Sequence, residues 1–190
     1  MPGSTTTSAD ETRRDELLAI RCQLGEAAAF DELVERWHRP LWLFARRMTA
    51  DEEAAREATQ DIWLRVLRAM PRLRDPARFR PWLFGIARRA LIDRLRRQYA
   101  RPELETLDVG SMAATDPAEP EPAERIDAML DELQHLPVIE RETLVLFYLD
   151  ELTLAQVADA LEVPAGTVKS RLFRARGMLR ERMNRRTTEP

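Results

Sequence analysis

Apolar residues between positions 153 and 179 recur at the spacing of two consecutive amphipathic helices. The first helix has its apolar stripe at i, i+3, i+4 and i+7, formed by Leu154, Val157, Ala158 and Leu161. Thr153 and Gln156 have the spacing of a capping box, in which each side chain accepts a hydrogen bond from the other residue's backbone. Pro164 disfavours helical geometry in the residue before it, so we expect this helix to end near Glu162.

A second helix is predicted from Ala165 onward, with one apolar side and one polar, basic side. Its stripe consists of Val168, Leu172, Ala175 and Leu179. At 100° per residue the opposite side carries Ser170, Phe173, Arg174 and Gly177, flanked by Lys169 and Arg171. Two such helices are typical of a helix-turn-helix that places side chains in the DNA major groove. A basic, solvent-exposed face of an ordinary helical hairpin is the alternative interpretation.

Similar stripes upstream predict a helical bundle over residues 15–98, after a disordered leader at residues 1–14. The predicted segments begin with a short helix after Asp15 and continue as 26–38, 41–48 after Pro40, 51–70, and 77–97. Asp51, Glu52 and Glu53 place negative charge at a helix N-terminus, where the helix dipole favours it. Pro71 and Pro76 bracket a predicted loop.

Residues 99–124 are predicted to be a flexible linker between this bundle and a second one. They contain four prolines and seven acidic residues, with few large apolar side chains, so they cannot form a core. The second bundle spans residues 125–183 and is followed by a tail at 184–190. Its helices before the helix-turn-helix are predicted up to Pro137 and over residues 138–149. The predicted fold class is therefore all-α, with two small helical bundles joined by an acidic linker.

Charge is distributed unevenly, although the formal net charge is only −3. Residues 78–101 carry eight arginines against Asp93, and residues 164–186 carry Lys169 and seven arginines against Glu181. Residues 102–132 carry ten acidic residues against Arg125. Two basic elements on either side of an acidic segment indicate a protein that binds nucleic acid through both bundles.

Other function classes find little support in the sequence. Cys22 is the single cysteine, which excludes an internal disulfide. No phosphate-binding loop, metal-ligand cluster or Ser/His/Asp pattern is present, and His38 and His135 have no partners nearby in sequence. We therefore expect no catalysis, no cofactor, no metal and no small-molecule substrate. No apolar run has the length of a signal peptide core or a membrane span, so we expect a soluble, cytoplasmic protein without membrane insertion.

Three motifs in this order resemble the bacterial sigma factors of the extracytoplasmic-function group, in their minimal two-domain form. FRPWLFGIARRALIDRLRR at 79–97 resembles the promoter-melting segment of the family. VPAGTVKSRLFRAR at 163–176 resembles its second promoter-binding segment, and QDIWLRV at 60–66 resembles the segment that docks on polymerase. The resemblance covers about residues 26–183.

This resemblance implies core RNA polymerase, promoter DNA and an anti-sigma factor as partners. Gln60 and Asp61 match positions that contact the polymerase clamp helices. The implied contacts to the minus-10 element involve Arg72, Arg74, Arg78, Arg80, Trp82, Arg88 and Arg89. The implied contacts to the minus-35 element involve Thr167, Lys169, Ser170, Arg171, Phe173 and Arg174. Arg89 departs from the asparagine that is common in the family, and Trp82 also fits the apolar stripe of its own helix.

A different class of DNA-binding protein shares part of this pattern. A helix-turn-helix regulator with an N-terminal effector domain would bind duplex DNA as a dimer, without polymerase. The acidic linker and the second arginine-rich helix have no evident role in such a regulator. In a sigma factor, the same linker could fold back on the basic faces and suppress DNA binding by the free protein.

Overall fold

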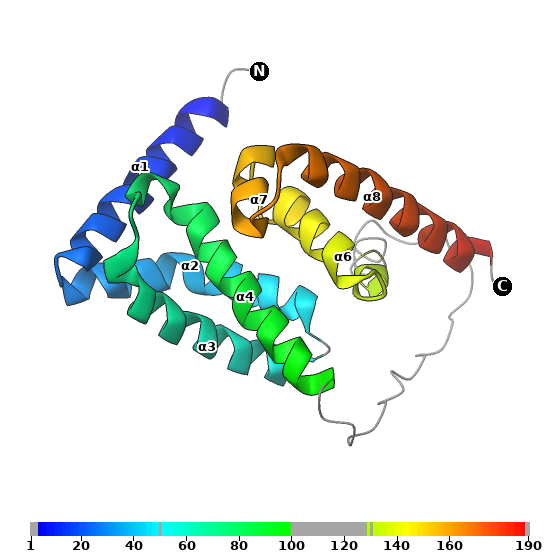
Figure 1. Ribbon diagram of the computed structural model, residues 1–190, viewed down its shortest axis with the longest axis horizontal. Coiled ribbons are helices and arrows are strands. Elements are labelled where there is room, and N and C mark those ends of the chain that lie inside the picture. The colour runs from blue at the N-terminus through cyan, green and yellow to red at the C-terminus, as the bar shows by residue number, and fades with distance from the viewer. Residues whose placement is uncertain (1–3, 50, 100–128, 130, 189–190) are drawn as a thin grey trace.

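A computed structural model describes residues 4–49, 51–99, 129 and 131–188, and its described residues form helices and turns. The N-terminal domain consists of α1 (Ser4–Gln23), α2 (Ala27–Met48), α3 (Glu52–Ala69), the 3-10 turns η1 (Met70–Arg72) and η2 (Pro76–Arg78), and α4 (Phe79–Tyr99). The C-terminal domain consists of α6 (Val138–Leu144), the π-type turn η3 (Val145–Leu149), α7 (Leu154–Leu161) and α8 (Ala165–Thr188). These elements confirm the all-α prediction (Figure 1). The predicted linker falls almost entirely outside the described residues, and so does the hypothesis that it folds back.

The first two helices differ from the prediction at their boundaries. Helix α1 begins at Ser4, so most of the predicted leader is helical. Gly25 has φ of +84° and reverses the chain between α1 and α2, a conformation that favours glycine. The predicted break at Pro40 is wrong, because α2 continues through it. A proline removes only one backbone donor, and the buried Trp37 and Leu41 on either side of it pack into the same core.

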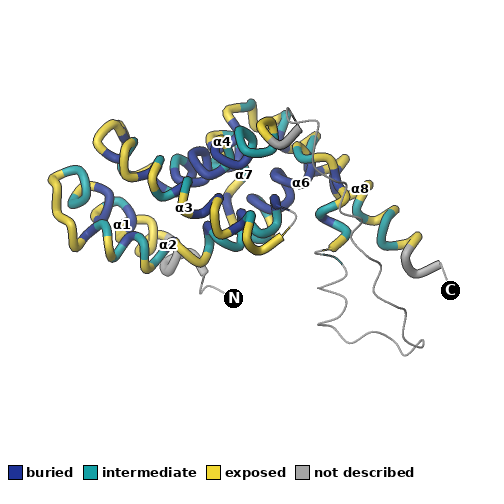
Figure 2. Tube along the Cα trace, turned by 90° about the horizontal axis from the view of Figure 1, so that it is seen from below, coloured by how far each residue is buried: buried dark blue, intermediate teal, exposed yellow. Residues whose placement is uncertain are grey.

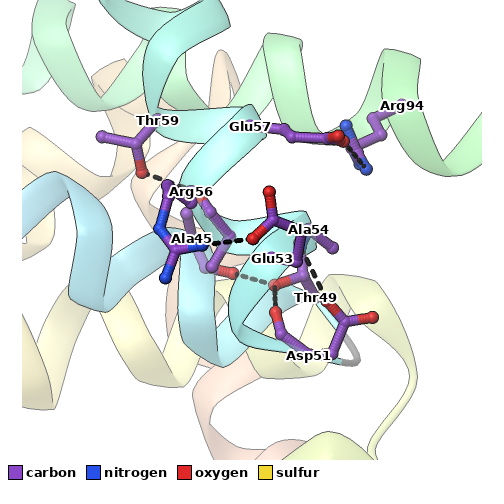
Figure 3. A network of polar contacts seen from close by, with 10 residues as sticks. Ala45, Thr49, Asp51, Glu53, Ala54, Arg56, Glu57, Thr59 and Arg94 are labelled. Carbon is purple, nitrogen blue, oxygen red and sulfur yellow. Dashed lines mark hydrogen bonds and ion pairs between the residues drawn. The ribbon is translucent and has the colours of Figure 1, made fainter.

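Helix α3 begins where the acidic cluster predicts. The Asp51 side chain accepts a hydrogen bond from the Ala54 amide at 2.7 Å and caps the helix, as Figure 3 shows. Glu57, further along α3, pairs with Arg94 of α4 at 2.7 Å. Arg65 of α3 likewise lies 2.8 Å from Asp93 of α4. These pairs fix α3 against the arginine-rich helix.

Aromatic residues from α2 and α4 form the centre of the N-terminal core. Trp37 makes edge-on contacts with Phe79 and Phe84, and Phe44 makes one with Phe84, at centroid distances between 5.5 and 6.2 Å. Phe79, Phe84 and Phe44 are almost completely buried. Because α4 is held along this core, the positions of its arginines are determined by packing.

The C-terminal domain contains the predicted helix-turn-helix. Thr153 and Gln156 form the capping box at the start of α7, and Glu162 ends α7 in the left-handed conformation. Val168, Leu172 and Ala175 of α8 are buried as the stripe predicts. Helix α8 continues to Thr188, beyond the predicted end of the domain at residue 183.

The two domains pack against each other, with α4 of the first lying along α7 of the second (Figure 1). Figure 2 shows buried chain in α4, α7 and α6 alike. The two helices come close at Gly85, where a Cβ atom would lie 3.5 Å from the Ala160 carbonyl oxygen of α7, an ordinary contact distance. The basic surface of α4 therefore faces the C-terminal domain.

Candidate nucleic-acid interface

The outer side of α8 presents most of the side chains that the sequence predicts for duplex DNA. Phe173 is 74% exposed, an unusual state for a phenylalanine in the absence of a partner. Lys169, Ser170 and Arg174 are also exposed, and Thr167 is half-buried at the start of the helix. The buried stripe on the other side holds α8 against α6 and α7. The helix thus has an aromatic, polar and basic outer surface that fits a DNA groove.

Arg171 is placed differently from the other predicted residues of α8. Its side chain is only 15% exposed, and its Nη1 atom lies 3.9 Å from Oε1 of Glu142, which is fully buried in α6. Arg171 therefore lies between the two helices, away from the outer surface. Arg174 remains 59% exposed while its Nη2 lies 3.2 Å from Glu140 Oε1. An acidic partner at this distance orients the guanidinium and leaves it accessible.

The arginines around the start of α4 surround a cavity of about 340 Å³ at the domain junction. The N-terminal domain contributes basic and aromatic side chains that the sequence predicts for minus-10 DNA, namely Arg72, Arg74, Arg78, Trp82 and Arg89. The C-terminal domain contributes Asp159 of α7 and Glu162 of the helix-turn-helix turn. Arg78 forms an ion pair with Asp159, and Arg89 forms one with Glu162.

The two remaining predicted minus-10 residues contact the C-terminal domain as well. Arg80 donates a hydrogen bond to the backbone carbonyl of Asp150. Arg88 donates one from Nε to Glu142 Oε2 at 2.8 Å. The entire predicted minus-10 set therefore lies at the junction with the C-terminal domain. The sequence predicts that these residues lie along α4 and the loop before it. It gives no indication that the C-terminal domain covers them.

Trp82 combines both roles that its sequence position allows. Its ring lies 5.8 Å from that of Phe79 and packs against the core, yet the residue is only partly buried and lines the junction cavity. One face of the indole thus contributes to stability. Another part of the side chain lines the cavity between the domains.

Helix α3 carries a second candidate surface on its outer side. Gln60 is exposed, and Asp61 is partly exposed and paired with Arg65 at 3.0 Å. Leu64 and Leu67 are 51% and 52% exposed and continue the face of Gln60 at i+4 and i+7. Sequence reasoning missed these two leucines. The sequence does indicate that Leu64 and Leu67 are exposed, because they are out of register with the buried stripe that contains Ile62 and Val66.

Two buried carboxyl groups at the junction have perturbed proton affinities. Burial raises the pKa of Glu142, and the hydrogen bond from Arg88 opposes this effect. Burial likewise raises the pKa of Asp150 to about 7, although Arg47 and Arg80 favour its charged form. Arg47 Nη1 lies 3.5 Å from Asp150 Oδ1. The junction therefore includes a carboxyl group that titrates near neutrality.

Other kinds of site have no counterpart in the described part of the chain. Residues 4–49, 51–99, 129 and 131–188 contain no group of three or more His, Cys, Asp or Glu side chains arranged to hold a metal ion. His38 and His135 are exposed. None of the helices in these ranges combines the length and the apolar character that a membrane-spanning helix needs.

Comparison with known families assigns each domain separately. Residues 33–101 match the family described as Sigma-70 region 2, and residues 126–179 match the family described as Sigma-70, region 4. The chain is 36% identical over 169 residues to the ECF RNA polymerase sigma factor SigM of Mycobacterium tuberculosis, which covers 89% of this chain and 84% of the relative. It is 29% identical over 170 residues to the ECF RNA polymerase sigma factor SigW of Bacillus subtilis, covering 84% and 91%.

Solved structures with the same fold include both domains. CnrH in complex with the cytosolic domain of CnrY superposes with a TM-score of 0.69 at 25% identity, over 90% of this chain and 97% of that one. The sigma factor RpoE from Bartonella quintana, in complex with the anti-sigma factor NepR, has a TM-score of 0.65 at 21% identity. It covers 82% of this chain and 96% of that chain.

Proposed function

Because the chain belongs to the extracytoplasmic-function group of the sigma-70 family, we propose that its two domains divide the recognition of a promoter between them. A sigma factor directs core RNA polymerase to promoters and starts transcription. In this chain, α8 binds the minus-35 element as duplex, whereas α4 and its preceding loop bind the minus-10 element as it opens. The observation that carries this assignment is the exposed outer side of α8, with Phe173 at its centre.

At the minus-35 element, the outer side of α8 enters the major groove. Arg174, Lys169 and Ser170 can donate hydrogen bonds to base edges or phosphates, and Phe173 can cover a thymine methyl group. Arg171 supports this surface from behind through Glu142. It is a positioning residue in this proposal, in contrast to the direct contact that the sequence resemblance implies.

At the minus-10 element, the arginines around the junction cavity bind phosphates and Trp82 stacks on an unpaired base. Opening DNA costs stacking and pairing energy, so a protein that opens it without fuel must bind the unpaired strand. The cavity between Trp82, Arg78 and Arg89 has suitable chemistry, since it combines an aromatic face with guanidinium groups. Minus-10 binding requires the C-terminal domain to move away from this surface.

Core RNA polymerase docks on the outer side of α3. Gln60 and Asp61 supply polar contacts, and the exposed Leu64 and Leu67 supply apolar area beside them. Apolar side chains half exposed on a helix surface are typical of an interface with a partner. This docking takes place in the cytoplasm, where polymerase lies. The protein acts by binding and not by catalysis.

An anti-sigma factor is the expected inhibitory partner. The solved structure of CnrH that superposes with this chain contains the cytosolic domain of CnrY, and the structure of RpoE contains an anti-sigma factor. An inhibitor that covers α3 or holds the domain junction closed would prevent both polymerase docking and minus-10 binding.

A mobility-shift experiment on a promoter duplex tests the function directly. The duplex is incubated with the protein alone, with core RNA polymerase alone, and with both, at one fixed salt concentration, because phosphate contacts make affinity depend steeply on salt. We expect a sequence-specific complex with permanganate-reactive, unpaired thymines only when both proteins are present. Tight specific binding by the protein alone, unchanged by core, would instead identify a stand-alone regulator.

A further inference from the structure

Arg174, on the outer side of α8, has an acidic partner in the interior of the C-terminal domain. Its Nη2 atom lies 3.2 Å from Oε1 of Glu140, whose side chain is only 10% exposed, whereas that of Arg174 is largely exposed. Glu140 belongs to α6, which packs along α8 (Figure 1). A buried carboxylate is thus directed at one guanidinium of the surface that the proposed function assigns to minus-35 DNA.

Stability does not account for a carboxylate at this position. Burial removes the hydration of a charged group, and an apolar side chain of similar volume is often at least as stabilising in its place. An ion pair with a largely exposed guanidinium compensates for little of this loss, since solvent screens it. The position of Glu140 is therefore unfavourable for folding alone, which indicates that its charge serves the outer surface of α8.

The contact with Glu140 restricts where the side chain of Arg174 can reach. A guanidinium group sits on a long, flexible side chain, and an exposed arginine without an acidic neighbour pairs with any phosphate within reach. Because the contact with Glu140 is made through Nη2, it leaves the donors on Nε and Nη1 to an acceptor on DNA. The negative charge of Glu140 repels phosphates and has little effect on the uncharged edge of a base pair. The ion pair therefore favours a base edge over the DNA backbone.

We propose that Glu140 is a positioning residue that determines specificity at the minus-35 element, because it commits Arg174 to a base edge and keeps it from the phosphate backbone. This inference rests on the proposed function, since it assumes that the outer side of α8 binds this element. A guanidinium held in one orientation can form two parallel hydrogen bonds with a single base, and less conformational freedom is lost when they form. Glu140 thus acts on DNA only through Arg174.

The other carboxylate that α6 directs at α8 has a different role. Glu142 is fully buried between Arg88 and Arg171, and Arg171 is itself only slightly exposed. These three side chains hold helices and domains together, so removal of Glu142 affects folding. Glu140 has its partner on the outer surface, so it can be replaced while the fold is kept.

The test compares the full-length wild type with a Glu140→Gln variant, in which the side chain keeps its size and loses its charge. Each protein is combined with core RNA polymerase and a duplex library of random base pairs long enough for both promoter elements, and the bound DNA is sequenced. We expect a preference of about tenfold at one base pair of the minus-35 element to fall to about twofold. Affinity for unselected random duplex should stay equal or rise by up to about threefold, because an acid near the phosphates is lost.

Salt dependence distinguishes this effect from a distorted helix. If Arg174 exchanges a base edge for a phosphate, the slope of log affinity against log salt concentration should become steeper by about one. A distorted helix would lose phosphate contacts, so its slope would become shallower. Glu140→Leu, which fills the same space with an apolar side chain, should reproduce the loss of preference without a fall in melting temperature.

Two further variants separate the role of this acid from a general effect of charge. Glu132→Gln removes another largely buried acid, which pairs with Arg182 further along α8 at 2.6 Å, so the net charge changes equally while Arg174 keeps its partner. Its base preferences should equal those of the wild type. Arg174→Ala should lose preference at the same base pair as Glu140→Gln, and combining the two substitutions should change that preference no further.

The proposal is overturned if Glu140→Gln retains the preference that Arg174→Ala loses, or if it weakens binding to all sequences alike. It is also overturned if Arg174→Ala leaves every base preference unchanged, since Glu140 would then orient no base contact. That result would remove one contact from the proposed minus-35 interface and leave the sigma function standing. A wild type that enriches no sequence together with core RNA polymerase would contradict the function itself.

Discussion

Arg88 Nε donates a hydrogen bond to Oε2 of Glu142 at 2.8 Å, and this contact joins the two domains through a carboxylate with no solvent exposure. Arg171 approaches the other carboxylate oxygen at 3.9 Å. One buried acid thus has a basic neighbour from each domain. A buried charge is tolerated only when such partners compensate for its lost hydration.

Loss of this carboxylate should be strongly destabilising. In a Glu142→Ala variant Arg88 and Arg171 keep their charge in a partly buried site without an acidic partner. We expect the free energy of unfolding to fall by about 3 kcal/mol, measured by urea denaturation and circular dichroism. A Glu53→Ala variant, which removes an exposed partner of Arg56, should lose less than about 1 kcal/mol. Equal losses would show that Glu142 is not an essential partner.

Neighbouring residues of α8 should separate stability from DNA binding. Phe173→Ala removes an exposed ring, so thermal stability should stay nearly unchanged while binding to a minus-35 duplex, with polymerase present, weakens about tenfold. Leu172 is buried, and Leu172→Ala should lower the free energy of unfolding by about 3 kcal/mol. Wild-type promoter affinity of Phe173→Ala would remove this ring from the DNA interface.

Stability should depend on pH through Asp150. Burial raises its pKa from an ordinary 3.8 to about 7, so between about pH 4 and pH 7 the folded protein binds more protons than the unfolded chain. Stability from this group is therefore present below pH 4 and is lost as the pH rises through 7. Asp150→Asn mimics the neutral acid, so its melting temperature should fall less than that of the wild type between pH 5 and pH 8. Parallel curves for the two proteins would contradict this prediction.

The exposed leucines of α3 should matter for polymerase and not for folding. Leu64→Ala with Leu67→Ala removes side chains that are about half exposed, so the melting temperature should change little. We expect affinity for core RNA polymerase to fall at least about tenfold, because apolar area at the centre of an interface contributes strongly to binding. Competition against a labelled wild-type protein measures this loss. Undiminished competition would place the docking surface elsewhere.

Periodicity predicted most helices correctly because each stripe reports burial along a single element. Val168, Leu172 and Ala175 are buried, and the capping box at Thr153 forms as its spacing indicates. The error at Pro40 arose from a local rule that tertiary packing overrides, since Trp37 and Leu41 hold α2 on both sides. The predicted start of α1 was too late, because a polar, Ser/Thr-rich segment carries no apolar stripe.

The domain junction could not be predicted in the same way. Arg89 and Glu162 are 73 positions apart, and Arg88 and Glu142 are 54 apart, so no local pattern links them. Arg171 shows how a distant partner changes the position of a single side chain. A helical wheel places it beside the outer face, but Glu142 in another helix draws it inward. Pairings between distant charges need the tertiary structure.

Glu162 shows that the best residue for the helix-turn-helix alone is not the best residue for the whole protein. Its φ of 57° belongs to a backbone conformation that costs a residue with a side chain about 1 kcal/mol and that glycine adopts freely. A Glu162→Gly variant should therefore raise the melting temperature of the C-terminal domain and at the same time release Arg89. The stability of the turn and the packing between the two domains then change in opposite directions, so a tighter turn would loosen the contact between α7 and α4.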